Sequence, residues 1–230
     1  MDKEWMQDIL GGLVVDGGEI VSPLCARFSC ALMVGGVGVL FMVDEQHGGT
    51  LGFSPGIADD GEGLQLSLGE GPGVDAHRVG HPVGVPDLAK STGGRWIEFG
   101  RSAVASGIAA VFGFPLAIGA ARVGAMTVYQ ATPGELSDDV FADCLMLADV
   151  TTHLVIGLQA DAAPGALAKE LAEVRGYRPE IHQATGMAAA QLGVSMAEAL
   201  VRLRAYAYAE ERPLIDVSCD IVDLRLRMTS

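Results

Sequence analysis

The pattern of apolar residues changes at the segment 162–165, which reads Ala-Ala-Pro-Gly. Before this segment, apolar runs typical of strands alternate with helical stretches, whereas every segment after it follows helical spacing. Proline and glycine interrupt both kinds of element, so the change marks a boundary between parts of the chain. The 230 residues are therefore expected to form a domain at 1–160, a linker at 161–167 and a second domain at 168–230.

The first part has the element pattern of an antiparallel α+β domain. Apolar runs bounded by turn residues predict strands at 36–44, 50–54, 81–88, 108–118 and 121–130. Helical spacing predicts helices within 4–30, at 96–107 and from Ser137 to about Gln159. Residues 46–49 are expected to turn the chain between the first two strands. Strands joined mainly by hairpins, with helices between them and at both ends, give an α+β fold.

The second part is expected to consist of three helices. The first covers about 166–192, where Pro179 is a candidate for a kink, and Gly193 ends it. Ser195 and Glu198 have the spacing of a capping box, so the second helix begins there. The third helix carries four apolar residues on one face: Leu214, Val217, Ile221 and Leu224.

Charge is distributed unevenly along the chain. The formal net charge is −14, which argues against unspecific coating of nucleic acid or anionic membranes. Residues 1–167 hold seven Lys and Arg against 20 Asp and Glu, whereas residues 168–230 hold eight against nine. Almost all the acidity thus belongs to the first part, and the second part is nearly neutral.

Neither a C-x-x-C pair nor a His-linked metal spacing occurs among Cys25, Cys30, Cys144 and Cys219. Thiols without such a pattern are typical of a reducing compartment. The start of the sequence lacks a signal-peptide pattern, and the longest apolar run, 31–43, is too short to cross a bilayer. We therefore expect a cytoplasmic protein that holds no cofactor and no metal and does not bind a membrane. Cys25, Cys30 and Cys144 are expected to be buried apolar thiols, with a thiol switch as the alternative.

On the second helix of the second part, side chains separate onto two sides. Five residues are expected to face the core: Ala199, Leu200, Leu203, Tyr206 and Ala207. The other side carries Val201, Arg204 and Tyr208, and the last two are neighbours because they lie four residues apart. A guanidinium beside a phenol suits stacking on an unpaired base and contact with phosphate. The alternative is a solvated face on which Glu198 pairs with Arg202.

A stripe on the preceding helix is almost without side chains in its middle, and it comprises His182, Gly186, Ala189, Ala190 and Gly193. Close packing of another helix is the more common cause of such a stripe, and close approach of a nucleic-acid backbone is the alternative. No nucleophile in this part has a plausible base beside it, so no catalytic residue is expected and the protein is not expected to be an enzyme.

Residues 182–207 read H-Q-A-T-G-M-A-A-A-Q-L-G-V-S-x-x-E-A-L-x-x-L-R-x-x-A, where x marks positions outside the pattern. This pattern resembles the ANTAR domain, a three-helix RNA-binding module of bacterial transcription antiterminators, over residues 168–228. The resemblance implies binding to RNA hairpin loops in leader transcripts, which blocks formation of an overlapping terminator. The candidate RNA-binding residues are Arg204, Tyr208, Arg202, Gln183, Thr185, Gly186 and His182. Thr185 stands where many family members have Lys, which removes one cation.

Two segments of the first part, LSLGEGPGVDAHRVGHPVGVPDL at 66–88 and FPLAIGAARVGAMTVY at 114–129, resemble the GAF domain. The resemblance spans about 15–158 and implies a PAS-like antiparallel sheet flanked by helices, with a small-molecule pocket on one sheet face in some relatives. The N-K-F-D-E motif of cyclic-nucleotide-binding members is absent, and no cysteine has the neighbouring histidine typical of bilin attachment. The domain is thus expected to bind an unidentified small molecule or to serve mainly in dimer formation. His77 lies in a polar, glycine-rich stretch and is expected to be solvated.

These resemblances together imply a bacterial, cytoplasmic regulator of transcription antitermination. Its GAF domain would sense a signal or form a homodimer, and its ANTAR domain would bind RNA. The wide apolar stripe of the helix from Ser137 supports the homodimer. One alternative is a ligand sensor or scaffold whose helical tail contacts proteins. Another is a methionine sulfoxide reductase of the GAF type, which requires Cys25 and Cys30 to act as attacking and resolving thiols.

Overall fold

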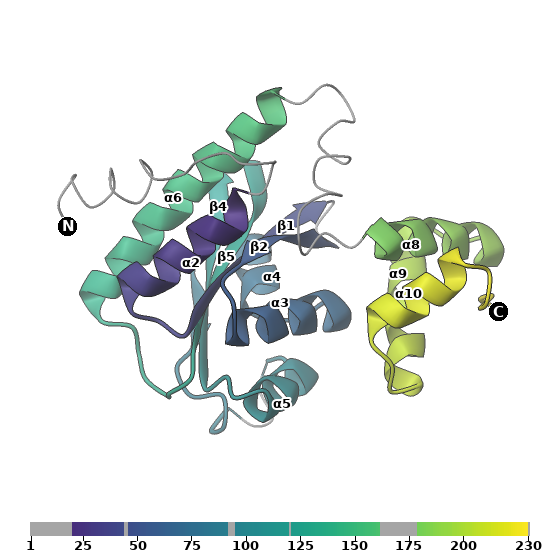
Figure 1. The fold of residues 1–230 in the computed structure, drawn as a ribbon, viewed down its shortest axis with the longest axis horizontal. Helices are drawn as coiled ribbons and strands as arrows, with labels where there is room; N and C mark the ends of the chain where they lie inside the picture. The colour runs from purple at the N-terminus through teal and green to yellow at the C-terminus, as the bar shows by residue number, and fades with distance from the viewer. Residues whose placement is uncertain (1–19, 44–45, 92–94, 120, 162–178, 230) are drawn as a thin grey trace. The chain divides into compact units, whose positions relative to one another are not determined.

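The computed structural model describes residues 20–43, 46–91, 95–119, 121–161 and 179–229. The chain divides into two compact units, Met1–Tyr177 and Arg178–Ser230, which we name the first and the second unit. Figure 1 shows a sheet with helices on both faces in the first unit and a group of helices in the second. The expected linker at 161–167 lies outside the described residues, apart from Asp161 at the end of a helix.

The described part of the first unit contains a five-stranded sheet and five helices. The strands are β1 (Gly36–Val43), β2 (Gln46–Phe53), β3 (Val83–Val85), β4 (Ala110–Ile118) and β5 (Ala121–Gln130). The helices are α2 (Val21–Leu32), α3 (Ile57–Leu68), α4 (Pro72–Val79), α5 (Ile97–Ala105) and α6 (Asp138–Asp161). The strand order is β2-β1-β5-β4-β3, and all neighbouring strands are antiparallel, which confirms the predicted α+β class.

The centre of the sheet is formed by β1 and β5, where Val39 pairs with Met126. β5 also forms a hairpin with β4, in which Phe114 pairs with the same Met126. Aromatic and β-branched residues of this kind suit strands that are covered on both faces. β3 is three residues long and lies at the edge of the sheet, between Pro82 and Pro86.

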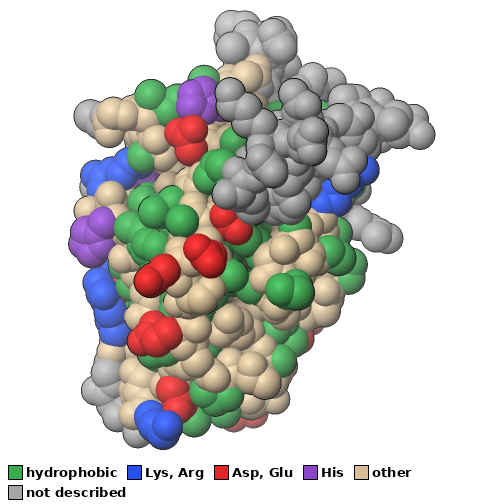
Figure 2. Space-filling view, turned by 90° about the vertical axis from the view of Figure 1, so that its left-hand side faces the viewer, with side chains coloured by type: hydrophobic (Ala, Val, Ile, Leu, Met, Phe, Trp, Pro, Cys, Tyr) green, Lys and Arg blue, Asp and Glu red, His purple; other side chains and the backbone are tan. Residues whose placement is uncertain are grey.

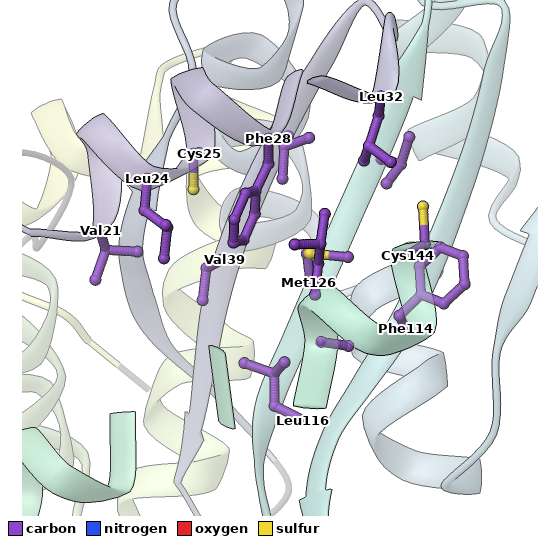
Figure 3. Close-up of a cluster of buried hydrophobic side chains, with 14 of the residues drawn as sticks. Val21, Leu24, Cys25, Phe28, Leu32, Val39, Phe114, Leu116, Met126 and Cys144 are labelled. Atoms are coloured by element: carbon purple, nitrogen blue, oxygen red, sulfur yellow. The ribbon is translucent and has the colours of Figure 1, made fainter. Parts of the chain in front are cut away.

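Alternate residues of the central strands point to opposite faces of the sheet, and helices cover each face (Figure 1). α2 and α6 cover one face, where Phe28, Phe114 and Met126 belong to a single buried cluster. Figure 3 shows these side chains converging from α2 and the strands. α3, α4 and α5 cover the other face, where Leu40 and Phe99 belong to a second cluster.

Two features of the first unit differ from the sequence prediction. β2 begins at Gln46, so the residues expected to form a turn at 46–49 belong to the strand. α3 and α4 escape prediction because the glycines and the proline in their sequences are signals of loops. In α3, a Cβ atom at Gly61 would lie 2.3 Å from the ring of Tyr129. The close packing of α3 on the sheet thus requires glycine there, against its low helix propensity.

Two predictions about exposure in the first unit are wrong. Cys30 is exposed, whereas Cys25 and Cys144 are buried as expected. His77 is only 6% exposed, because α4 packs against β4 and β5. Burial raises the pKa of the Cys144 thiol to about 12 and raises the pKa of Cys25 well above its ordinary range.

The described part of the second unit contains three helices: α8 (Pro179–Leu192), α9 (Met196–Ala209) and α10 (Leu214–Val222). Gly193 has a φ of +66°, the left-handed conformation that ends α8. Ser195 caps α9 as predicted, since its hydroxyl accepts a hydrogen bond of 3.2 Å from the backbone nitrogen of Glu198. The part of the first predicted helix at 166–178 lies outside the described residues, so the proposed kink at Pro179 stays a prediction.

The core of the second unit is formed where α8 packs against α9 and α10. Ala184, Ala188, Leu203, Val217 and Ile221 are all completely buried there. The predicted apolar faces of α9 and α10 are therefore confirmed, with two exceptions. Tyr206 of α9 was expected to face the core but is only half-buried. Leu224 is 78% exposed because α10 ends before this residue, so it lies outside the apolar face assigned to it.

Candidate nucleic-acid interface

One side of α9 faces solvent with an aromatic and a branched apolar side chain. Tyr208 is 60% exposed and Val201 is 59% exposed, whereas Ala199, Leu203 and Ala207 on the opposite side are buried. The predicted division of α9 into two sides is thereby confirmed for these five residues. An aromatic ring that contributes so little to the core is free to stack on a planar group from outside.

Arg204 lies at the edge of this exposed side, not in its middle. Its side chain is half-buried, so the expectation that it points fully away from the core is wrong. The reason is helix geometry: Arg204 follows Leu203 directly and stands one turn after Leu200, and both leucines are buried. Burial lowers the pKa of Arg204 to about 10, because loss of water disfavours the charged guanidinium. The side chain nevertheless remains charged at neutral pH.

Arg202 forms an ion pair on the flank of the same helix. Its Nη2 lies 2.6 Å from Oε1 of Glu198, and the two side chains are 41% and 50% exposed. This is the pair expected for a solvated helix face. An exposed pair one helical turn apart contributes about 0.3–0.5 kcal/mol, so Glu198 holds Arg202 only weakly.

The candidate residues on α8 differ in what they expose. Gln183 is exposed, and Gly186 is half-buried, with Met196 of α9 4.0 Å from the position that a Cβ atom would take. Thr185 is only 4% exposed, and its hydroxyl donates a hydrogen bond of 2.6 Å to the backbone oxygen of Ile181. Its side chain faces the core and is not available to a ligand, which corrects its assignment to the interface. The side chain of His182 lies outside the described part of the structure.

An acidic residue that the sequence did not single out organises two further arginines. Asp220 Oδ2 lies 2.6 Å from Arg212 Nη2, and its Oδ1 lies 2.7 Å from Arg225 Nε. These two cations hold the pKa of Asp220 below its ordinary value. The residues are eight and five positions apart, which no helical pattern reveals. Arg212 and Arg225 therefore form ion pairs within the second unit, and these pairs neutralise part of its positive charge.

In the first unit, a pocket of about 220 Å³ lies beside the edge strand β3. Its lining includes Pro82, Phe112, Phe114, Glu135 and Phe141. Pockets for drug-sized ligands usually have volumes of about 300–1,000 Å³, so this one suits only a small molecule. No group of three or more His, Cys, Asp or Glu that could hold a metal occurs among the residues described.

α6 leaves part of its apolar surface exposed. Phe141, Leu145 and Met146 are 38%, 44% and 37% exposed. Figure 2 shows the side of the molecule that lies on the left in Figure 1, where hydrophobic side chains are interspersed with acidic ones. The stretch Asp138–Gly157 is long and apolar enough to cross a membrane by length and composition. Leu147 and Ala148 of the same helix are buried against the sheet, however, as in the core helix of a globular domain.

Comparisons with known proteins relate the two parts of the chain to different kinds of domain. The family model of the ANTAR domain matches residues 169–222. The GAF domain of a phosphoenolpyruvate-protein phosphotransferase from Coxiella burnetii superposes with a TM-score of 0.53 at 14% identity, covering 69% of this chain and 92% of that chain. The corresponding GAF domain from Acinetobacter gives a TM-score of 0.51 at 11% identity, with coverages of 70% and 98%.

A GAF domain/HD domain protein from Geobacter sulfurreducens also superposes, with a TM-score of 0.51 at 13% identity, covering 65% of this chain and 99% of that chain. No curated protein matches the sequence. The identities are low, so these structures show the fold of the first unit and not its ligand. The chain thus carries an ANTAR domain at residues 169–222 together with a domain of the GAF fold, which is the GAF-ANTAR architecture.

Proposed function

We propose that the protein is a bacterial, cytoplasmic regulator of transcription antitermination whose ANTAR domain binds RNA hairpin loops in leader transcripts. The observation that carries this proposal is the match of residues 169–222 to the ANTAR domain. The exposed side of α9 supports it, because Tyr208 suits base stacking and the same helix carries the charged residues Arg202 and Arg204, both half-buried. Gln183 and Gly186 of α8 complete the proposed interface, with His182 as a further candidate.

The first unit would then sense a signal, form a homodimer, or do both. The exposed apolar residues of α6, Phe141, Leu145 and Met146, are the proposed dimer surface. The small pocket beside β3 is the candidate site for an unidentified small molecule. Neither role requires chemistry on a substrate.

The cysteines do not support an oxidoreductase. Cys25 is buried and its thiol stays protonated, since burial and the charge of Glu62 both raise its pKa. Cys30 is exposed five residues later on the same helix, so the two thiols lie on different sides of α2. An attacking and a resolving thiol must instead reach each other.

Binding of the full chain to an RNA with two hairpins tests the proposed function. We expect affinity to fall with a linear slope as the logarithm of salt concentration rises, because phosphate contacts release counterions. The control is an RNA of equal length and composition whose scrambled sequence forms no hairpins, and it should bind much more weakly. Equal affinity for the two RNAs, or no salt-dependent binding, would favour the alternative that the helical unit contacts proteins.

A further inference from the structure

A buried polar network joins α3 to the sheet on the face that α3, α4 and α5 cover. Glu62 and Gln65 of α3 are 1% and 0% exposed, and Tyr129 of β5 is 0% exposed. The Tyr129 hydroxyl donates a hydrogen bond of 2.8 Å to Oε1 of Glu62. The amide nitrogen of Gln65 donates to the Tyr129 hydroxyl at 2.8 Å and to Oγ1 of the buried Thr127 at 3.2 Å. Two consecutive turns of α3 are thus fixed to one strand.

The same network reaches the beginning of α4. Oε1 of Gln65 accepts a hydrogen bond of 2.8 Å from the backbone nitrogen of Gly73, in the first turn of that helix. Gln65 therefore uses both ends of its amide, one toward β5 and one toward α4. A change in the position of α3 must be transmitted to α4 or break this contact.

Glycines let the network lie directly against the backbone around it. A Cβ atom at Gly38 of β1 would come within 2.4 Å of Oε1 of Glu62, and one at Gly71 within 2.7 Å of Gln65. Together with Gly61 under the ring of Tyr129, these positions leave the carboxyl group enclosed by protein. Oε2 of Glu62 is buried without a hydrogen-bond partner of normal geometry among the described residues.

The titratable groups nearest in the network cannot offset a negative charge on Glu62. Burial and the neighbouring carboxylate raise the pKa of Tyr129 well above its ordinary value, so the phenol stays neutral. Burial and the same carboxylate keep Cys25 of α2 a neutral thiol. β1 over Gly36–Met42 and β2 over Gly49–Phe53 contain no titratable side chain.

Cations on the elements around α3 are engaged elsewhere. Ion pairs join Arg78 and Arg95 to Asp75 on α4, and Arg101 to Glu98 on α5. Arg122 of β5 donates to the backbone oxygen of His77, which is itself buried on α4. α3 itself adds only the exposed acids Asp59 and Asp60. None of the ion pairs formed by described residues includes Glu62.

We propose that Glu62 is a proton-operated switch in the GAF-fold unit: the protonated carboxyl keeps α3 closed on the sheet, and its ionisation loosens α3 and the start of α4. The proton passes from Glu62 to solvent when the helix opens, and no other reactant is needed. An uncompensated charge in an apolar enclosure is unfavourable, and outward movement of α3 relieves it by admitting water. The switch does not depend on the proposal of RNA binding.

The direction of the pH response follows from the carboxyl group. Burial raises the pKa of Glu62 from its ordinary value of 4.5 to about 7. Interactions with four buried side chains lower it in part: Tyr129, Thr127, Gln65 and Thr50 of β2. The closed form therefore keeps a proton that the opened form has already lost. The stabilisation of the closed form is complete below about pH 4.5 and is lost as the pH rises to about 7.

Hydrogen exchange of the full chain at pH 5.5 and 7.5 tests the switch, after correction for the intrinsic dependence of exchange on pH. We expect the equilibrium constant for opening of α3 to be about 20-fold larger at pH 7.5 than at pH 5.5. This factor follows from a Glu62 pKa of about 7 in the closed form and 4.5 in the opened form. In Glu62→Gln, which mimics the protonated acid, the amides of Ile57–Leu68 should be protected equally at both values. Asp60→Asn, an acid-to-amide change on the same helix, should behave as the unmodified protein does.

Infrared difference spectra of the unmodified chain make the test independent of whether Glu62→Gln folds. A band of a protonated, buried carboxylic acid should disappear between pH 5.5 and 8. Persistence of α3 protection across this range in the unmodified protein, or the absence of a titrating acid band, would overturn the proposal. So would an equal pH response of Glu62→Gln in a folded variant.

Discussion

Nη2 of Arg202 lies 2.6 Å from Oε1 of Glu198, one turn earlier on α9. In the proposed complex, RNA phosphates compete with this carboxylate for the guanidinium. Glu198→Gln should therefore raise the affinity for a two-hairpin RNA and make the salt dependence steeper, because one more cation becomes available to phosphate. The free energy of unfolding should change by at most about 0.5 kcal/mol, as for an exposed pair. Fluorescence anisotropy at several salt concentrations measures the first effect, and urea unfolding measures the second.

Glu98→Gln is the matched control for this change. Glu98 pairs with Arg101 on α5 in the first unit, with an N–O distance of 3.1 Å. The substitution therefore removes one negative charge from a similar exposed ion pair that lies outside the second unit. An equal gain in affinity from both substitutions would show a general charge effect and would remove the argument that Arg202 touches RNA.

Tyr208 and Arg204 should respond differently to truncation. Tyr208→Ala removes a ring that is 60% exposed, so we expect RNA affinity to fall by about 1–3 kcal/mol with the salt slope unchanged. Arg204→Ala should weaken binding by a similar amount and reduce the salt slope by about 1, provided the guanidinium meets a phosphate. Thr185→Ala, at a buried position of α8, should change stability more than it changes RNA affinity. Unchanged binding by Tyr208→Ala would mean that the exposed side of α9 is not the interface.

Two glycines on α3 allow a strict test of how closely this helix packs on the sheet. Gly61→Ala places a Cβ atom 2.3 Å from the ring of Tyr129, and we expect it to destabilise the first unit by about 1–3 kcal/mol through overpacking. Gly63→Ala meets nothing within 4 Å and should stabilise the unit by about 0.5–1 kcal/mol, as for alanine in an exposed helix. Thermal unfolding followed by circular dichroism distinguishes the two variants. Equal effects of both would show that α3 does not lie this close to β5.

The second unit should lose stability in acid through Asp220. Arg212 and Arg225 lower the pKa of this carboxyl group, so the stabilisation is present above its ordinary value of 3.8 and is lost as the pH falls through the lowered pKa. Asp220→Asn should make the stability of this unit less dependent on pH below about 4. Unfolding curves of the full chain at a series of acidic pH values, with Asp216→Asn as the control, measure the difference. A parallel acid response of the unmodified protein and Asp220→Asn would contradict this role.

The exposed apolar side of α6 should hold two copies together. Leu145, 44% exposed, lies in this patch, so Leu145→Glu should convert the dimer to a monomer in light scattering at micromolar concentration. Val104→Glu on α5 changes an apolar residue of similar exposure, 42%, and should leave the mass unchanged. A monomer mass for the unmodified protein would refute the proposed dimer directly.

The sequence predicted those helices and strands whose caps and apolar patterns agree with the structure that forms there. Ser195 before Glu198 marked the beginning of α9, and apolar runs bounded by turn residues marked β4 and β5. α3 could not be predicted in the same way, since Gly61 serves a contact with Tyr129 that lies 68 residues further along the chain. The low helix propensity of glycine at this position therefore reflects the close contact with β5 and gives no indication that the segment is a helix.

The candidate interface was predictable only in outline. Helical spacing placed Val201 and Tyr208 correctly on the exposed side of α9. It failed for Arg204, because the burial of a residue at the border between two sides depends on the neighbouring helices. Thr185 was a candidate through the resemblance to the ANTAR pattern, which does not reveal that its side chain is buried. Asp220 had no local signal at all, since its two arginine partners come from outside its own helical turn.

The shortness of β3 restricts how copies of this protein can associate. An edge strand offers unpaired backbone groups to which a strand of another molecule can add. Here only Val83–Val85 forms the ladder with β4, and the prolines at 82 and 86 lack the amide hydrogen that a further strand would need. The backbone oxygen of Pro86 already accepts a hydrogen bond of 2.8 Å from Gly134. This margin of the sheet is therefore protected against the addition of a strand from another molecule.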